Sequence, residues 1–166
     1  MNQTSLDRQP VAPEARSQAC AQMLRTWVEA LMERSMRHFT QFLREEGLSV
    51  PQASTLFRLY YRGPAAVSDI SSHLGVTNAA ASQMVDRLVQ QGYVERWELP
   101  EDRRVKQLAL TAAGRALIER AIEARQGWLS QVPQHLTPDE QETLMQTLPR
   151  LMAAVRQLNE SEAETD

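Results

Sequence analysis

The sequence predicts a mainly α-helical fold with one small β-hairpin. Over most of the 166 residues, apolar side chains recur at steps of three and four, which is the spacing of one helix face. Only between residues 93 and 110 does the pattern change to the alternation that is typical of strands. Glycines and prolines separate the segments. We therefore expect a series of helices interrupted by a single hairpin.

The first predicted element is one long helix over residues 15–46. Its apolar positions are Met23, Trp27, Val28, Leu31, Met32, Met36, Phe39, Phe42 and Leu43. Gly47 ends it, because glycine adopts the left-handed conformation at a helix C-terminus at least cost. Ser49 and Gln52 then form a capping box with Pro51 in the first turn, which predicts a second helix to about Arg62.

Two short helices are predicted to meet at Gly75. Val67, Ile70 and Leu74 mark one face of the first, and Val85 and Leu88 one face of the second. The hydroxyl of Thr77 is placed to cap the second helix, which should run to about Gln91. A corner this tight between two helices that share a core is expected of a helix-turn-helix.

A hairpin follows directly. Residues 93–98 and 105–110 alternate as strands, and residues 99–104 form a polar turn that ends in two arginines. A helix-turn-helix followed by such a hairpin is a winged helix-turn-helix, whose usual function is to bind duplex DNA.

Two further helices complete the prediction. Thr111 can cap a helix that reaches about Gln131, and Thr137 with Glu140 forms a second capping box. The last helix carries apolar residues at steps of four, three, four and three, namely Leu144, Leu148, Leu151, Val155 and Leu158. Such a heptad stripe often packs within one chain. Here the terminal helices present more apolar surface than a small winged domain can cover, which favours a homodimer.

The motifs resemble those of the MarR (multiple antibiotic resistance repressor) family. Asp102-Arg103-Arg104, with Leu108 to Thr111 and Gly114 after it, resembles the family's wing signature of D-x-R, L-x-L-T and G. Residues 74–77, 85–88 and 92–96 resemble its recognition helix and first wing strand, and the element order matches from about residue 20 to 158. The resemblance implies a homodimeric transcription regulator that is released from DNA by a small phenolic ligand or by oxidation.

The recognition helix supplies most of the candidate DNA contacts. Small side chains let its backbone approach the floor of the major groove, Gln83 can bond adenine, and Arg87 lies one turn further, within reach of phosphate. The same alanines are also simply good helix formers. The candidates are Thr77, Asn78, Ala80, Ser82, Gln83 and Arg87. By resemblance, Asp86 is a structural partner that fixes an arginine near the wing.

The predicted wing supplies the remaining candidates. By resemblance, Arg104 enters the minor groove while Asp102 holds its guanidinium group; narrow, A·T-rich grooves attract such an arginine. Arg103 and Lys106 are candidate phosphate contacts. A charged hairpin tip can also be merely solvated.

An effector site is expected where the predicted dimer helices meet the winged domain. Its candidates are Trp27, His38, Arg58, Tyr61 and Trp128, which would suit a small aromatic or anionic ligand. Cys20 offers the alternative of a redox sensor. It lies more than a turn before the sensing position of the redox members, and a free cysteine is commonly a small buried hydrophobe.

Composition limits the other function classes. No glycine loop for phosphates, nucleophile elbow or metal-ligand cluster is present, so we expect neither an enzyme nor a cofactor. No apolar run would span a membrane, and a soluble, cytoplasmic protein is expected. The net charge of −3 includes four acidic residues in the last eight positions, and residues 16–158 carry about +2. A winged helix used only as a protein-interaction module remains an alternative.

These observations give a domain division. We expect a disordered arm over residues 1–15, a winged helix-turn-helix over 49–110 and an acidic tail over 159–166. Residues 16–48 and 111–158 should form the helical dimerisation region.

Overall fold

The computed structural model describes residues 12–98 and 106–163. The chain forms two compact units, one that extends to Arg125 and one that begins at Gln126. The first contains α1 (Pro13–Glu45), α2 (Val50–Arg62), β1 (Ala65–Ala66), α3 (Val67–Leu74), α4 (Asn78–Gln90), β2 (Val94–Glu98), β3 (Lys106–Leu110) and α5 (Ala112–Gln126). The second contains the 3₁₀ helix η1 (Gly127–His135) and α6 (Pro138–Ala163). The prediction of a mainly helical fold with a small hairpin is confirmed.

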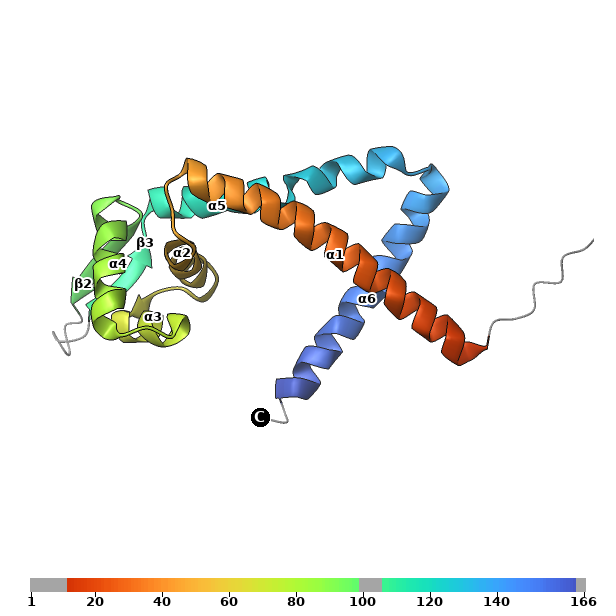
Figure 1. Ribbon diagram of the computed structural model, residues 1–166, viewed down its shortest axis with the longest axis horizontal. Helices are drawn as coiled ribbons and strands as arrows, with labels where there is room; N and C mark the ends of the chain where they lie inside the picture. Colours follow the sequence, from red (N-terminus) through yellow and green to blue (C-terminus); the bar gives the residue numbers. More distant parts are fainter. Residues whose placement is uncertain (1–11, 99–105, 164–166) are drawn as a thin grey trace, which may run out of the picture. The chain divides into compact units, whose positions relative to one another are not determined.

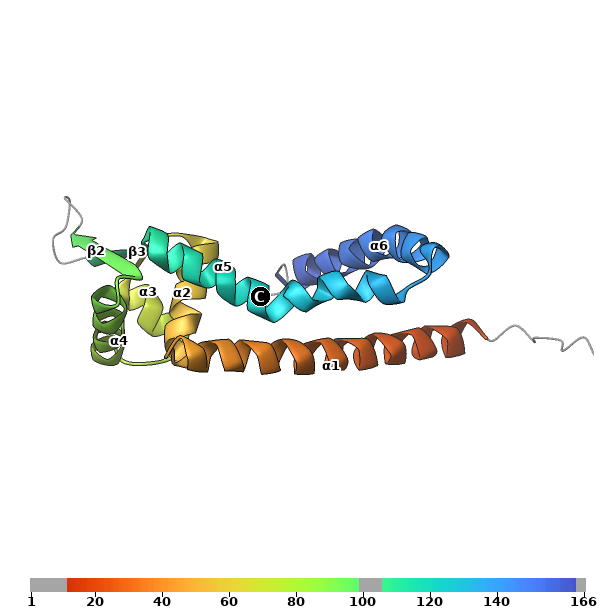
Figure 2. The same cartoon turned by 90° about the horizontal axis from the view of Figure 1, so that it is seen from above.

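Helix α1 is a single long helix whose C-terminal end alone is buried. Figures 1 and 2 show α2, α3, α4 and the hairpin gathered near that end, and only Phe42 and Leu43 of α1 are buried. The helix begins at Pro13, so residues 13–15 do not belong to a disordered arm. Proline is favourable in a first helical turn, and Glu14 complements the positive end of the helix dipole.

The predicted caps and corners are present. Ser49 Oγ accepts a hydrogen bond from the Gln52 backbone N–H at 3.4 Å, and Gln52 Oε1 accepts from the Ser49 N–H at 2.9 Å. Gly75 follows α3 with φ 65° and ψ 33°, in the left-handed region that glycine adopts most readily. The helix-turn-helix therefore forms where its local signals predicted it.

The sheet has three strands, one more than the sequence predicted. Its order is β1-β3-β2 and both pairings are antiparallel. The additional strand is Ala65–Ala66, which pairs with Gln107 and Leu108. Two residues are too few to show an alternating pattern, so only the partner strand identifies β1.

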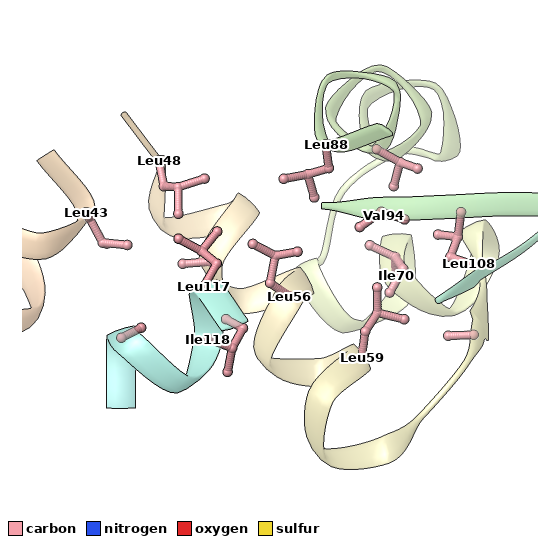
Figure 3. Close-up of a cluster of buried hydrophobic side chains, with 14 of the residues drawn as sticks. Leu43, Leu48, Leu56, Leu59, Ile70, Leu88, Val94, Leu108, Leu117 and Ile118 are labelled. Atoms are coloured by element: carbon pink, nitrogen blue, oxygen red, sulfur yellow. The ribbon is translucent and has the colours of Figure 1, made fainter. Parts of the chain in front are cut away.

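A single apolar core lies between α2, α3, α4, α5, the end of α1 and one face of the sheet. Figure 3 shows Leu56 and Leu59 of α2 pointing toward this cluster, with Ile70, Leu88 and Leu108 contributed by other elements. Leu117, Ile118 and Ala121 of α5 are buried in the same core. Residues 111–125 therefore belong to the winged unit, whereas the sequence had placed them in the dimerisation region.

The predicted helix from Thr111 to about Gln131 changes its geometry earlier. The α-helix ends at Gln126, and a 3₁₀ helix runs from Gly127 to His135. Glycine has low helix propensity and Pro133 lacks a backbone N–H, so continuation of the α-helix is unfavourable there.

Helix α6 is longer than predicted. The capping box forms as expected, since Thr137 Oγ1 accepts from the Glu140 backbone N–H at 3.4 Å and Glu140 Oε2 accepts from the Thr137 backbone N–H at 2.8 Å. The helix contains Pro149 and continues to Ala163, so residues 159–163 of the predicted acidic tail belong to α6. Alanine and glutamate are good helix formers, which explains the extension.

Candidate nucleic-acid interface

Helix α4 has one face in the core and one face in solvent. Ala81, Val85 and Leu88 are fully buried, which fixes the rotation of the helix. Ala80 and Gln83 are exposed on the opposite side, with Arg87 one turn beyond Gln83. Ala80, Gln83 and Arg87 therefore share one accessible face of a helix whose other face packs in the core.

The start of α4 is tied to α3. Thr77 caps the helix by accepting from the Ala80 backbone N–H at 3.2 Å. The amide of Asn78 is hydrogen-bonded to Ser71 Oγ at 2.6 Å, and Ser71 is buried. The first turn of α4 is thus held by side chains of both helices of the motif, which limits the positions from which Asn78 can reach a ligand.

Asp86 connects α4 to the hairpin. Its Oδ1 accepts a hydrogen bond from Nη2 of Arg96 on β2, and the two side chains form an ion pair. The Arg96 side chain is 20% exposed, so the guanidinium group lies largely within the fold. The expectation that Asp86 fixes an arginine near the wing is confirmed.

Three of the predicted DNA contacts, Asp102, Arg103 and Arg104, lie outside the described residues. Lys106, the only lysine of the chain, is exposed at the first position of β3. Across the strand pair its partner is Glu98, and the structure gives Lys106 no ion pair among the described residues.

A hollow of about 350 Å³ opens beside these groups. It is bounded by the end of β1, the start of α3, one side of α4 and the two hairpin strands. Its polar lining comes from Ser68, Asn78, Ser82, Arg96 and Lys106, and Ala66 and Val67 add apolar surface. Sequence reasoning had included Asn78, Ser82 and Lys106 but missed Ser68 and Arg96. The missed signal was in β2, where residues 94, 96 and 98 share one face and Val94 is buried. A charged residue at the next position of that inner face is unusual in a simple core strand.

The predicted dimerisation residues are not covered within the chain. Leu144, Val155 and Leu158 are exposed, and Leu148 and Leu151 are half-buried. Helix α1 carries a similar set of exposed apolar side chains, namely Met23, Trp27, Val28, Met32 and Met36.

The predicted effector residues are only partly brought together. Phe57 of α2 stacks with Tyr61 at 6.1 Å between ring centroids and contacts Phe39 of α1 at 5.9 Å. Trp27 lies twelve residues before Phe39 on the same helix, which corresponds to about 18 Å, so it does not join this cluster within one chain. His38 is half-buried beside Phe39 in the sequence, and Trp128 belongs to the second unit.

Arg58 has an unusual environment. Its Nη1 atom is buried and has no hydrogen-bond partner among residues 12–98 and 106–163. A buried cationic donor without an acceptor is costly, and such groups are normally paired. Arg58 is therefore the predicted effector residue whose surroundings most resemble a binding group.

Other kinds of site find no support within residues 12–98 and 106–163. No cluster of three or more His, Cys, Asp or Glu side chains there is arranged for a metal ion. None of the helices in these ranges combines the length and hydropathy that crossing a membrane requires. Cys20 is exposed on α1 and forms no disulfide.

Comparison with known proteins agrees with this geometry. Residues 48–106 match the model of the MarR family. The transcriptional regulator PrsX of Escherichia coli is 39% identical over 75 residues, which cover 45% of each chain. YsmB of Bacillus subtilis, named as an HTH-type transcriptional regulator, is 26% identical over 117 residues, which cover 66% of this chain and 80% of YsmB.

A solved structure shares nearly the whole architecture. The transcriptional regulator Tm0710 from Thermotoga maritima superimposes with a TM-score of 0.71 at 26% identity, over 84% of this chain and 96% of Tm0710. The matched relatives are regulators and not enzymes, in agreement with the expectation from the sequence. Residues 48–106 therefore match the MarR family, and the chain is similar over most of its length to transcriptional regulators.

Proposed function

We propose that the chain acts as a homodimer that binds a pseudopalindromic DNA operator and represses transcription until a small aromatic or anionic ligand releases it. The division of α4 into a buried and an accessible face carries this proposal. Core packing of Ala81, Val85 and Leu88 would present Gln83 to base edges in the major groove. A protein-interaction module would have no need of small and amide side chains on that face.

The exposed apolar surface supports the dimer. Side chains such as Met23, Met32, Val155 and Leu158 are about half exposed or more in the single chain. An exposed apolar stripe along a helix marks a surface for contact with another protein. A two-fold arrangement of these helices would place two recognition helices on one face of the DNA.

Selection of bound genomic DNA tests the operator. We expect an inverted repeat whose half-site centres lie about 10 bp apart, because the two helices must enter successive major grooves. If the dimer neutralises about six to ten phosphates, a plot of log affinity against log salt concentration should have a slope of about −5 to −9. Recovery of no inverted repeat, or binding that is indifferent to salt, would contradict the proposal.

Two substitutions separate the roles of helix and wing. Gln83→Ala should relax the preference at one base position in each half-site and cost on the order of 1–3 kcal/mol. Arg104→Ala should weaken binding most on A·T-rich flanks, because Arg104 would recognise a narrow minor groove. Equal losses on A·T-rich and G·C-rich flanks would refute the minor-groove role of Arg104.

The effector is proposed to bind near Arg58 and Tyr61. The buried, unpartnered Nη1 of Arg58 would gain an acceptor from a carboxylate or phenolate, and the stacked pair Phe57 and Tyr61 offers aromatic surface. Ligand binding releases DNA only if the ligand favours a spacing at which the two recognition helices cannot both enter successive major grooves. The coupling is reciprocal, so operator DNA should weaken ligand binding by the same factor.

A panel of aromatic acids, titrated with and without operator, tests this site. Arg58→Gln should abolish release by the active acid while DNA binding without the acid is retained. The redox alternative is tested separately by mild peroxide treatment of the wild type and of Cys20→Ser. Release by peroxide in the wild type alone would replace the ligand mechanism with a redox switch at Cys20.

A further inference from the structure

The hollow between α4 and the hairpin contains two cations on the inner face of the sheet. Residues in a strand alternate between faces, and directly opposed residues share a face. The register pairs Arg96 with buried Leu108 and Glu98 with Lys106. Arg96 and Lys106 therefore continue the row of side chains that begins with core residues, and they line the hollow together.

Only one of the two cations has a structural explanation. Arg96 forms an ion pair with Asp86, which leaves other N–H groups of its guanidinium free to donate. Lys106 forms no ion pair with a described residue. Its cross-strand partner Glu98 does not form an ion pair with it. A hollow with an unpaired ammonium group and no carboxylate in its described lining suits an anion.

The remaining lining combines the apolar residues Ala66 and Val67 with three side chains that can form hydrogen bonds. The hydroxyls of Ser68 and Ser82 and the amide of Asn78 face the same space. Ser68 lies in the first turn of α3, where backbone N–H groups have no partner within the helix. Two cations with short polar donors around them are typical of a contact to a phosphate group.

The position of the hollow identifies the phosphate. Adjacent grooves of a duplex are separated by one sugar–phosphate backbone. If α4 enters the major groove and the hairpin the neighbouring minor groove, that backbone must cross the surface between them, where the hollow opens. We infer that the hollow seats one phosphodiester of the operator backbone, held by Lys106 and Arg96 with Ser68. The inference rests on the proposed operator binding and adds a fixed contact that sets the register between helix and wing.

A single-phosphate scan tests the inference on the operator recovered by genomic selection. Each phosphate in turn is replaced by a neutral methylphosphonate, and affinities are measured for the wild type and for Lys106→Gln. Replacement of the phosphate at one position in each half-site should weaken binding of the wild type about tenfold. The same replacement should have little further effect on binding of the Lys106→Gln variant. The Lys106→Gln variant should lose affinity by the same factor for every DNA sequence. The slope of its log affinity against log salt concentration should become shallower by about 1 for each hollow.

Matched variants separate this contact from a general effect of charge. Arg37→Gln removes the same charge from an exposed position on α1 and should couple to no single phosphate. Arg87→Gln should couple to a phosphate at a different position. Ser68→Ala should reproduce a weaker form of the Lys106→Gln pattern, and retained helical circular dichroism would confirm that both variants fold.

Lysine chemistry provides an independent readout. Lys106 is the only lysine, so reductive methylation with ¹³C-formaldehyde labels its Nζ and the N-terminal amine alone. Operator DNA should shift the Lys106 methyl signal, and the methylphosphonate operator should not. If the wild type binds its operator but no phosphate position couples to Lys106, the hollow inference is wrong while the proposed function stands. Binding of free inorganic phosphate in the hollow without any such coupling would also overturn it. If the wild type binds no duplex, the proposed function itself fails.

Discussion

At the scale of single residues, the junction between α5 and the hairpin brings two backbone segments into close contact. Thr111 Oγ1 donates to the Gly92 carbonyl at 2.6 Å and accepts from the Gly114 backbone N–H at 3.0 Å. The Thr111 N–H donates to the Tyr93 carbonyl at 3.1 Å. A Cβ on Gly114 would lie 2.0 Å from that same carbonyl oxygen. Glycine is therefore required by the close approach of two backbones.

Gly114→Ala should destabilise the protein by about 1–3 kcal/mol or more, because the neighbouring atom belongs to the backbone and cannot move like a side chain. Chemical denaturation measures the loss of unfolding free energy. Ala113→Ser, at an exposed neighbouring position, should change stability by no more than about 0.5 kcal/mol. Equal stability of Gly114→Ala and wild type would show that α5 does not pack as described.

Asp86 is the second residue whose role is specific to tertiary structure. Asp86→Asn removes the charge that orients Arg96 and should lower stability by on the order of 1 kcal/mol, since Asp86 is about half exposed. Operator affinity should fall by more than this loss of stability explains, because Arg96 also lines the hollow. An unchanged operator affinity would indicate that the ion pair serves the fold alone.

At the scale of elements, the helices begin where side chains satisfy their first N–H groups. The cap of α6 is the clearest case, because hydrogen bonds from the Thr137 backbone and then from its side chain lower the pKa of Glu140. A carboxylate whose pKa is lowered by folding stabilises the folded state at pH values above its pKa in the unfolded chain. That contribution is lost as the pH falls through the folded pKa.

We therefore expect α6 to lose its N-terminal turn in acid, at pH values below the ordinary glutamate pKa of 4.5. Amide hydrogen exchange at Glu140 and Gln141, whose N–H groups donate to Thr137, measures the fraying when each rate is expressed as a protection factor relative to the intrinsic rate at that pH. In Thr137→Ala the protection factors should be lower at neutral pH and should depend less on pH. Equal protection factors at pH 3 and pH 7 in the wild type would exclude this role of Glu140.

At the scale of the whole molecule, the two units bury their apolar surface to different extents. The winged unit has a closed core, whereas α6 has no fully buried side chain among its described residues. A helix with an uncovered apolar face is stable in water only if another surface packs on it. This difference is the physical reason to expect a second copy of the chain.

Leu151→Glu should convert the dimer to a monomer, because it places a charge in the apolar stripe of α6. Sedimentation at micromolar concentration measures the change. Gln157→Glu adds the same charge at an exposed position outside the stripe and should leave the dimer intact. A wild type that sediments as a monomer would contradict the dimer.

The sequence alone determined the features that depend on neighbouring residues. Capping boxes at Ser49 and Thr137, the left-handed Gly75 and the buried face of α4 are all encoded within a few positions. Local signals define helix ends less well where helix propensity competes with packing. The observed ends at Gln126 and Ala163 therefore differ by several residues from the predicted ones.

Only the tertiary structure decided the features that join distant residues. Strand β1 exists because β3 pairs with it, and Gly114 is required because Tyr93 lies against it. Arg96, Lys106 and Ser68 line one hollow although up to 38 positions separate them. Side-chain periodicity shows which face of its own element a residue occupies, but only packing between elements decides which faces meet.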